Sequence, residues 1–279
     1  GVTSLIDPAH NEEAVIARCL GAFLEGAEPS ELDVVVACNG CTDRTAERAR
    51  AFGDAVTVIE LEKPSKTVAL NAADKVAKGF PRLYVDADVI LPLTSVRRLA
   101  AVLQNDEVQL ASPVARTDVS ASSAAVRAFY DVWLRLPYNR VMVGTGVYAL
   151  SERGRKRFGE FPEIIADDGY VRSRFFPIER VAVQDAPVTV FAPRRFRDLV
   201  RVKTRGRVGD YELREKYPSP GMSDPKETAA ILRSLPWGIA LPWKLMVYVW
   251  LNVVVRVGAR RRLRGERELV WERDEDSRV

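Results

Sequence analysis

The amino-acid sequence predicts an α/β fold with a mostly parallel sheet flanked by helices, followed by a helical C-terminal extension. Two observations support this prediction. In the first half, short runs rich in Val, Ile and Leu alternate with segments whose apolar residues recur at helical spacing. This alternation is typical of a parallel sheet, because each crossover helix returns the chain to the start of a neighbouring strand. Beyond Pro193 the pattern becomes helical and basic, which predicts the extension.

The strands of the first half are short β-branched runs bounded by polar residues or proline. They are expected at Thr3–Ile6, Leu32–Ala37, Val56–Glu60 and Arg82–Val85. The intervening helices are expected at Glu12–Glu25, Arg44–Phe52 and Thr67–Ala77, with N-caps at Asn11, Thr42 and Ser65. Ligands of such sheets bind beyond the C-terminal ends of the strands, so the polar clusters that follow these strands form the candidate site.

The second half has a less regular pattern. Its helices are expected at Leu93–Gln104, Ser122–Leu136 and Ile164–Phe176, the last of which begins with acidic residues. Its strands are expected at Gln109–Pro113 and Val147–Leu150, with a small hairpin made of Val181–Val183 and Val188–Phe191.

The bulk composition is that of a globular protein. Its 279 residues suit one large α/β domain or one domain plus an appendage, and 47% of them are hydrophobic. A net charge of +4 is too small to indicate nucleic-acid binding. The cysteines Cys19, Cys38 and Cys41 give no disulfide framework, and no signal peptide is recognised, so we expect a cytoplasmic location. The single histidine, His10, excludes a His-rich zinc site.

Two carboxylates follow the fourth predicted strand, in the string Asp86-Ala87-Asp88. Carboxylates at this spacing, where the chain turns, can converge on one divalent cation, and hard oxygen ligands suit Mg²⁺ or Mn²⁺. The remaining coordination positions can take diphosphate oxygens. The alternative is an acidic turn in which Asp88 is a cap.

The first two strands also end in polar loops. Pro8, Ala9, His10, Asn11 and Glu12 open a helix, whose N–H groups attract phosphate, although acids there also stabilise the helix dipole without a ligand. Taken alone, this loop favours the second role. The Cys-x-x-Cys string after the second strand is interpreted as a turn and cap rather than a redox or zinc motif, because no second ligand pair exists.

The order of these motifs resembles glycosyltransferase family 2, inverting enzymes of the Rossmann-like GT-A fold, over about residues 3 to 175. SLIDPAHNEE is similar to the opening strand and nucleotide loop, with Asp7 in place of the customary aliphatic residue. CNGCTDRT is similar to the next turn, with Asn39 where a base-contacting Asp is usual. The resemblance implies that Lys66 lies near the diphosphate, that Asn71 belongs to the donor site, and that the two acids after the fourth strand bind the metal.

The resemblance also implies an acceptor side. Asp167 and Asp168 match an acid pair at a helix start, in which the second acid is the general base and the first supports it. Like-charge repulsion would hold the pKa of the base nearer neutral. The alternative is a pair of acids that only stabilises the helix N-terminus. The segment Gly144, Thr145 and Gly146 resembles the acceptor loop.

Processive members carry a Gln-x-x-Arg-Trp motif that this chain lacks, which favours transfer of a single sugar. Arg201 and Arg205 stand in about its place, one helical turn apart. They could share a phosphate, lie in solvent or bind lipid headgroups.

The C-terminal segment combines aliphatic, aromatic and basic residues. Leu245–Val255 is apolar apart from Asn252 and has about half the roughly 20 residues that a spanning helix needs. A cluster of arginines follows it. This pattern suits a helix lying in an anionic membrane surface, and equally a helix packed on the catalytic domain. The last residues, WERDEDSR, are similar to bacterial members of the family.

These observations together predict a catalytic domain at 1–200, with a nucleotide-sugar half at 1–90 and an acceptor half at 91–200. Residues 201–279 are expected to form a helical extension in contact with the inner membrane face. The expected partners are a UDP- or GDP-sugar, a glycan or lipid-linked acceptor and a Mn²⁺ or Mg²⁺ ion, with no nucleic acid. The alternatives are a retaining transferase or sugar nucleotidyltransferase of the same fold, or an inactive membrane-surface binding protein.

Overall fold

The computed structural model describes residues 1–136, 146–218 and 241–264. The described part divides into two compact units. The first contains residues 1–117 and 146–191, and the second contains residues 118–136, 192–218 and 241–264. Each unit is considered separately below.

The first unit is built on a seven-stranded sheet in the order β3-β2-β1-β4-β6-β5-β7. Strands β1 to β4 are mutually parallel, and β6 runs antiparallel to both β4 and β5. This arrangement confirms the predicted α/β fold with a mostly parallel sheet. The strands are β1 (Thr3–Ala9), β2 (Leu32–Asn39), β3 (Val56–Leu61), β4 (Arg82–Val85), β5 (Leu110–Asp118), β6 (Val147–Leu150) and β7 (Arg180–Phe191).

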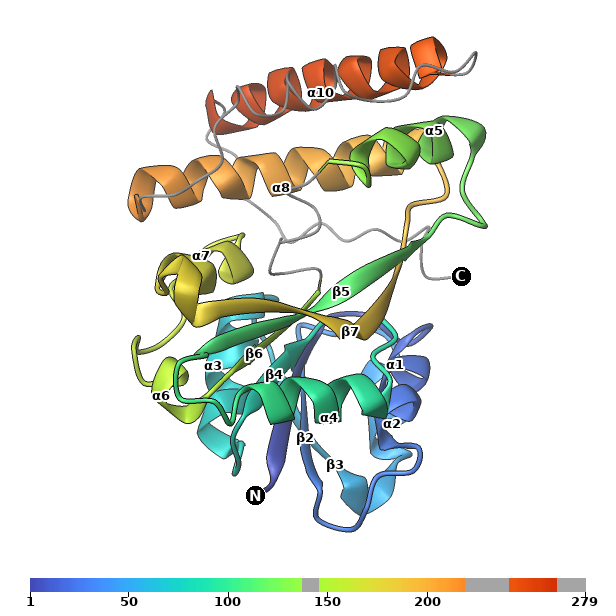
Figure 1. Ribbon diagram of the computed structural model, residues 1–279. Coiled ribbons are helices and arrows are strands. Elements are labelled where there is room, and N and C mark those ends of the chain that lie inside the picture. Colours follow the sequence, from blue (N-terminus) through green and yellow to red (C-terminus); the bar gives the residue numbers. More distant parts are fainter. Residues whose placement is uncertain (137–145, 219–240, 265–279) are drawn as a thin grey trace. The chain divides into compact units, whose positions relative to one another are not determined.

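Helices cover both faces of this sheet (Figure 1). On one face α1, α2 and α4 share a core with the inward side chains of the strands, among them Leu5, Val36 and Val85. On the other face α3 packs against β1 and β2. The helices of this unit are α1 (Ile16–Leu24), α2 (Thr45–Arg50), α3 (Lys66–Val76), α4 (Leu93–Val102), α6 (Glu152–Arg155) and α7 (Asp167–Ser173).

The helix starts confirm one of the three predicted caps. Ser65 caps α3, because its hydroxyl accepts a hydrogen bond from the backbone N–H of Val68. The caps predicted at Asn11 and Thr42 are wrong, since α1 begins at Ile16 and α2 at Thr45. Asn11 instead adopts a left-handed conformation (φ 52°), and its Oδ1 accepts hydrogen bonds from the N–H and hydroxyl of Thr42. Two loops that we expected to start helices independently are therefore tied to each other.

The hairpin predicted at 181–191 is also wrong, because β7 runs unbroken from Arg180 to Phe191. The polar pair Gln184 and Asp185, followed by Pro187, resembled a turn. Ala186 and Val188 nevertheless lie fully buried in the core. Proline is tolerated here because β7 is an edge strand, where a missing N–H costs no ladder hydrogen bond.

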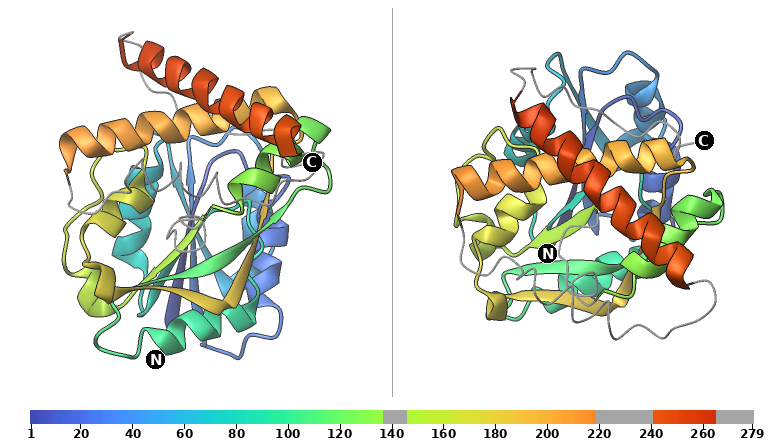
Figure 2. Two further views of the ribbon diagram at one scale, coloured as in Figure 1. Left: turned by 45° about the horizontal axis from the view of Figure 1, so that its top comes forward. Right: turned by 90° about the horizontal axis from the view of Figure 1, so that it is seen from above.

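The second unit is helical and consists of α5 (Ala124–Trp133), α8 (Phe196–Lys216) and α10 (Leu241–Arg264). Figure 2 shows α10 crossing α8, and α10 also contacts α5. Val247, Tyr248 and Leu251 of α10 are buried in this core with Phe129 of α5. The predicted helical extension is thus present. Within the described ranges, no helix has both the length and the apolar character needed to cross a bilayer.

Candidate active site

The end of β4 places Asp86 against the start of β6. The backbone N–H of Asp86 donates to the carbonyl of Gly146 at 2.8 Å. Gly146 adopts φ +85°, and a Cβ at this position would lie 2.8 Å from Cγ1 of Val89. A side chain is excluded here on both counts, so the glycine allows β6 to approach the acidic turn closely.

Lys66 joins two acidic segments that are far apart in the sequence. Its Nζ lies 2.8 Å from Oδ1 of Asp86 and 3.0 Å from Oδ1 of Asp167. Lys66 is the first residue of α3, whereas Asp167 begins α7. Burial lowers the pKa of Lys66, but the neighbouring carboxylates of Asp167 and Asp86 outweigh burial and raise it. The ammonium group therefore stays charged and holds the two acids together.

Asp167 is buried and has a second partner on β6. The hydroxyl of Tyr148 donates to Oδ2 of Asp167 at 3.2 Å. Burial, followed by the charge of Asp167, raises the pKa of Tyr148 well above its usual range, so the phenol keeps its proton. Both carboxylate oxygens of Asp167 are thus engaged with protein groups.

Asp168 has a different environment from its neighbour. Its side chain is half-buried, and its Oδ1 accepts a hydrogen bond from the N–H of Gly169 at 2.8 Å. Burial and the adjacent charge of Asp167 raise the pKa of Asp168 to about 6. A carboxylate with such a pKa is mostly ionised at pH 7 and is still a useful proton acceptor.

Asp7 adds a buried carboxyl group beside the acidic turn. It is 1% exposed, and its Oδ1 has no hydrogen-bond partner within the described part of the chain. The Sγ of Cys19 lies 3.9 Å from Oδ2 of Asp7 and 3.7 Å from the carbonyl oxygen of Asp86. Burial, with Glu12, Asp86 and Asp88 as like charges, raises the pKa of Asp7 well above its usual value. Asp88 itself is half-buried.

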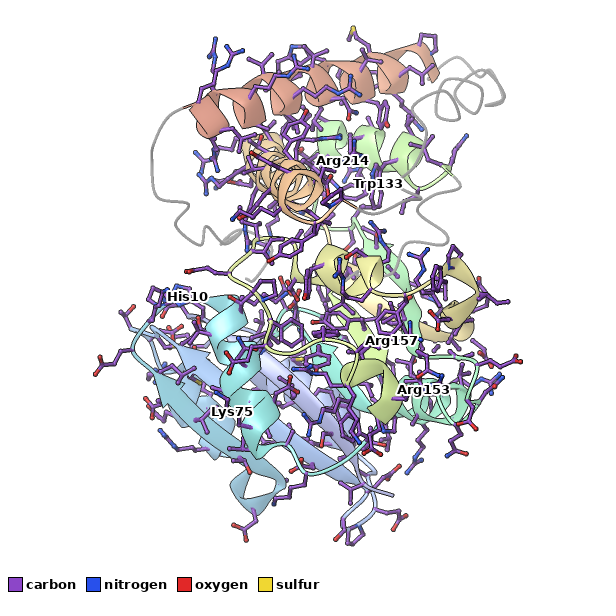
Figure 3. All side chains as sticks on the ribbon, turned by 90° about the vertical axis from the view of Figure 1, so that its left-hand side faces the viewer. His10, Lys75, Trp133, Arg153, Arg157 and Arg214 are labelled. Carbon is purple, nitrogen blue, oxygen red and sulfur yellow. The ribbon has the colours of Figure 1, made fainter. Side chains whose placement is uncertain are left out.

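The loops after β1 and β2 form the neighbouring part of the site. Nδ1 of His10 (labelled in Figure 3) donates to the carbonyl of Asn39 at 2.6 Å. The amide of Asn39 donates back to the carbonyl of Ala9 at 2.8 Å, and Asn39 is completely buried. Pro8 lies buried within β1, and the N–H of Glu12 donates to the hydroxyl of Thr45. The two strand ends are therefore fastened to each other.

The Cys-x-x-Cys string lies in these loops as free thiols. Hydrogen bonding to Cys38 lowers the pKa of Cys41 to about 7, although burial opposes this change. Between the cysteines Gly40 takes φ +56°, where a Cβ would lie 2.7 Å from Cβ of Pro64. The turn that we predicted for this string is present.

Asn71 connects α3 to the loop that precedes α7. Its Nδ2 donates to the carbonyl of Phe161 at 2.9 Å, and its Oδ1 accepts from the N–H of Phe161 at 2.7 Å. This two-point contact positions the loop leading to Asp167. Its predicted contact with a donor stays a prediction.

Four predicted residues lie outside the described part of this unit. Gly144 and Thr145 lie outside the described residues. Arg201 and Arg205 belong to α8 of the second unit. There a guanidinium nitrogen of Arg201 lies 3.8 Å from Oδ1 of Asp198. Their role stays a prediction.

Two features of the site were not predicted from the sequence. Tyr148 pairs with Tyr84 across β6 and β4, and their rings stack with centroids 4.8 Å apart. Asp74 of α3 accepts hydrogen bonds from Arg82, Arg155 and the hydroxyl of Tyr84. Tyr148 lies in the short apolar strand predicted at Val147–Leu150, and no signal in that strand indicated its acidic partner.

Comparison with known proteins agrees with this architecture. A family model described as glycosyl transferase family 2 matches residues 4–154. A probable glycosyltransferase of Bacillus subtilis, YdaM, is 31% identical over 112 residues, which are 37% of this chain and 27% of that protein. This chain therefore spans about a quarter of that relative's length.

Solved structures of glycosyltransferases share the fold. The mannosyltransferase PcManGT from Pyrobaculum calidifontis, in complex with GDP-Man and Mn²⁺, has a TM-score of 0.63 at 22% identity, covering 94% of this chain and 78% of its own. Glucosyl-3-phosphoglycerate synthase from Mycobacterium tuberculosis, in complex with Mn²⁺, UDP and glucosyl-3-phosphoglycerate, has a TM-score of 0.55 at 22% identity, covering 79% and 81%. Another structure of that synthase contains Mg²⁺ and UDP, with a TM-score of 0.55 at 22% identity, covering 79% and 80%.

The family model extends over more than half of this chain, from β1 through the acidic turn after β4 to the first turn of α6. The order of motifs in this chain and its GT-A fold agree with the family model, and we conclude that the chain belongs to glycosyltransferase family 2.

Proposed function

We propose that this protein transfers a single sugar from a nucleotide diphosphate sugar to an acceptor hydroxyl, with inversion at the anomeric carbon. The observation that carries this proposal is the pair of contacts made by Lys66. They bring the acids after β4 beside the acid pair of α7 within one unit. An acidic turn that could hold a cation, close to an acid pair that could supply a base, supports a displacement at a sugar carbon.

Asp86 and Asp88 are the residues that would hold a Mn²⁺ or Mg²⁺ ion. Within the described residues, no group of three or more His, Cys, Asp and Glu side chains could hold a metal. Two carboxylates nevertheless fit this chemistry, because such ions are commonly held by one or two carboxylates together with substrate phosphates. Lys66 contacts Oδ1 of Asp86, whose side chain is 37% exposed and thus accessible to a ligand. The ion would offset charge on the departing diphosphate.

Lys66 is proposed to contact the diphosphate as well. It lies at the first turn of an 11-residue helix, where backbone N–H groups also favour anions. Its side chain is 21% exposed and thus accessible to a ligand. A phosphate oxygen could replace Asp86, the more exposed of its two carboxylate partners, so that the ammonium group keeps two anionic neighbours.

Asp168 is proposed as the general base, and Asp167 as its positioning neighbour. The oxygens of Asp167 are engaged with Lys66 and Tyr148, whereas Asp168 is half-buried with a pKa raised to about 6. Asp168 would accept the proton of the acceptor hydroxyl. The hydroxyl oxygen of the acceptor would attack the anomeric carbon from the face opposite the leaving diphosphate. Gly144, Thr145 and Gly146 are proposed to border the acceptor.

The nucleoside is proposed to bind at the linked ends of β1 and β2, where Pro8 to Glu12 and Asn39 lie. UDP- and GDP-sugars are the candidate donors, because PcManGT was solved with GDP-Man and the Mycobacterium tuberculosis synthase was also solved with UDP-Glc. Residues 1–90 would then bind the donor, and residues 91–200 would bind a glycan or lipid-linked acceptor.

Thermal-shift measurements with UDP and GDP, each with and without Mn²⁺, would test this proposal. We expect one diphosphate to raise the midpoint in a metal-dependent way, because a ligand of the native state alone stabilises it by mass action. Asp88→Asn should abolish the shift, whereas Asp54→Asn, at an exposed acid on a surface turn, should preserve it.

A folded protein that shows no shift with any nucleotide would contradict donor binding and would favour the inactive alternative. Once a donor is found, NMR of the product gives the anomeric configuration. A retained configuration would overturn the role proposed for Asp168.

A further inference from the structure

The helix α10 has an unusual charge distribution. Its 24 residues include Lys244, Arg256, Arg260, Arg261, Arg262 and Arg264, and no Asp or Glu. The basic residues gather at its C-terminal end, where Arg256, Arg260, Arg261 and Arg264 are exposed. Cations at this end also complement the helix dipole, but a helix stabilised in this way does not need five arginines.

The same helix has two apolar faces. One face packs on α5 and α8 through Val247, Leu251 and Val255. The other contains large apolar side chains that are exposed at a spacing of three and four residues, which places them along one stripe. This stripe consists of Trp243, Met246, Trp250, Val253 and Val257, and each of these side chains is between 44% and 59% exposed.

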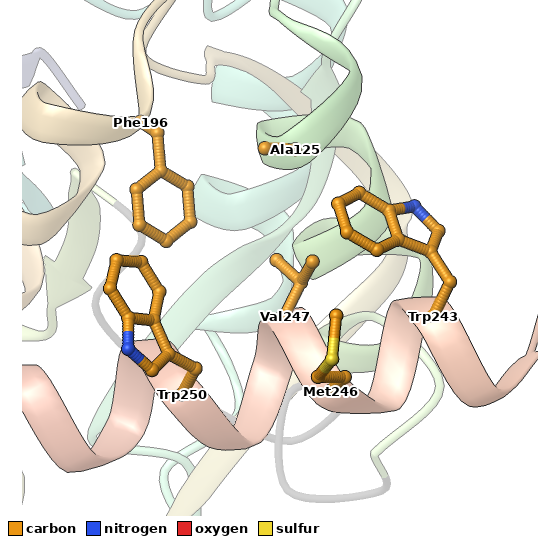
Figure 4. Close-up of a pocket in the computed structure, with 6 residues that line it drawn as sticks. All are labelled: Ala125, Phe196, Trp243, Met246, Val247 and Trp250. Carbon is orange, nitrogen blue, oxygen red and sulfur yellow. The ribbon is translucent and has the colours of Figure 1, made fainter.

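A cavity opens on this stripe. It has a volume of about 370 Å³ and is lined by Ala125, Phe196, Trp243, Met246, Val247 and Trp250 (Figure 4). The ring of Trp250 stacks on Phe196, with centroids 5.2 Å apart. All the lining residues belong to the second unit. Its apolar lining suits a hydrocarbon chain rather than a polar ligand.

We propose that this face of α10 binds the surface of an anionic lipid bilayer. The helix would lie in the plane of the interface, its stripe inserted among the acyl chains and its arginines at the headgroups. Tryptophan suits this position because its ring is apolar and its N–H is polar.

The charges favour a bilayer over a second copy of the chain. In a parallel pair of α10 helices the two arginine clusters would lie side by side, and in either orientation α10 provides no acid to compensate its basic residues. An anionic surface instead gains from each of them, by about fivefold in binding for each basic residue at the surface.

Sedimentation of the full chain with vesicles tests this proposal. We expect binding to vesicles of phosphatidylcholine mixed with phosphatidylglycerol, and weak binding to phosphatidylcholine alone. The double variant Arg260→Gln/Arg261→Gln should bind about 25-fold more weakly, and Arg48→Gln/Arg153→Gln, at exposed arginines of the first unit, should bind like the unmodified chain.

The apolar part is tested separately. Met246→Gln/Val253→Asn should weaken binding by about tenfold or more, because each buried CH₂ contributes about 0.8 kcal/mol. The control is Phe176→Gln/Ile178→Asn, which removes two exposed apolar side chains from the first unit. Circular dichroism verifies that each variant keeps its helices.

Three outcomes would overturn the proposal. They are unchanged binding of the Arg260/Arg261 variant, a dimer that the Met246/Val253 variant dissociates, or competition by nucleic acid for binding to α10 with no affinity for vesicles. None of them depends on transferase activity, so the proposed function and this inference can fail independently.

Discussion

Lys66→Met is the substitution that tests the assembly of the site most directly. Methionine keeps most of the length of the side chain and removes its charge. Two carboxylates, Asp86 and Asp167, then lose the ammonium group that lies 2.8 and 3.0 Å from them. The expected result is a marked loss of stability, because a buried charge left without its partner is costly.

The magnitude follows from the burial of each partner. The side chain of Asp167 is 4% exposed, and that of Asp86 is 37% exposed. Removing one partner of a buried pair costs about 3–5 kcal/mol, whereas an exposed pair contributes about 0–1 kcal/mol. We therefore expect a loss of about 3 kcal/mol, mostly from Asp167. In a chain of this size, that loss corresponds to a decrease of about 6–12 °C in the thermal midpoint.

A matched control lies on the same helix. Lys75 (labelled in Figure 3) is paired with Glu160 at 2.8 Å, but both side chains are more than two-thirds exposed, at 69% and 68%. Lys75→Met should lower the free energy of unfolding by less than about 1 kcal/mol. Thermal unfolding followed by circular dichroism, without metal or nucleotide, compares the two variants under one condition.

The decisive result is the difference between the two lysines and its dependence on Asp167. If Lys66→Met costs no more than Lys75→Met, Lys66 does not compensate a buried charge and our explanation of the site is refuted. If the explanation holds, adding Asp167→Asn to Lys66→Met should recover part of the loss, since the uncompensated carboxylate is gone. The second variant also distinguishes lost charge compensation from lost packing of the lysine stem.

Three further predictions concern other groups of the site. The value of kcat should rise with pH through about 6 as Asp168 ionises, and Asp168→Asn should lower kcat by about 10²- to 10⁴-fold in steady-state assays with little change in thermal midpoint. Gly146→Ala should lower the free energy of urea unfolding by about 1–3 kcal/mol, because Gly146 has a φ of +85° and a Cβ there would meet Val89. Gly159→Ala, with open space around the added Cβ, should lower it by less than about 1 kcal/mol, as ordinary surface substitutions do. Asp7→Asn should raise the thermal midpoint measured in EDTA, and more so at pH 8 than at pH 5. The pKa of Asp7 is higher in the folded protein than in the unfolded chain. The folded protein therefore loses stability as the pH rises from the unfolded-state pKa towards the folded-state pKa, and the neutral amide, which does not titrate, avoids this loss.

Much of the sheet could be predicted because its signals are local. The predicted bounds of the strands at 82–85 and 147–150 are those observed. The first two strands extend further than predicted, to Ala9 and Asn39, because Ala9 pairs with Cys38 and Asn39 pairs with Leu61 of β3. A polar residue such as Asp7 looks like the end of a strand, and only the neighbouring strand shows that it continues.

The arrangement of the site could be predicted only in part. The order of motifs indicated which acids matter, but the contact between Lys66 and Asp167 joins residues 101 positions apart. No local pattern encodes such a contact, since it depends on how α3 and α7 are placed by the sheet. The same holds for Asn71. The family resemblance implied a place in the donor site, and its amide is engaged with the backbone of Phe161.

The electrostatics of this site connect its stability to its chemistry. Asp7, Asp86, Asp167 and Asp168 gather near a single lysine, and burial raises the pKa of three of these four acids. An arrangement with more acids than cations costs folding free energy that an apolar cluster would not. Proteins retain such a costly cluster where a bound ligand supplies positive charge, or where a catalytic base needs a pKa close to neutral pH. Both conditions hold for the transfer proposed here. A ligand that supplies positive charge should therefore stabilise this protein beyond its own binding contacts, which makes the thermal midpoint a sensitive measure of the occupied site.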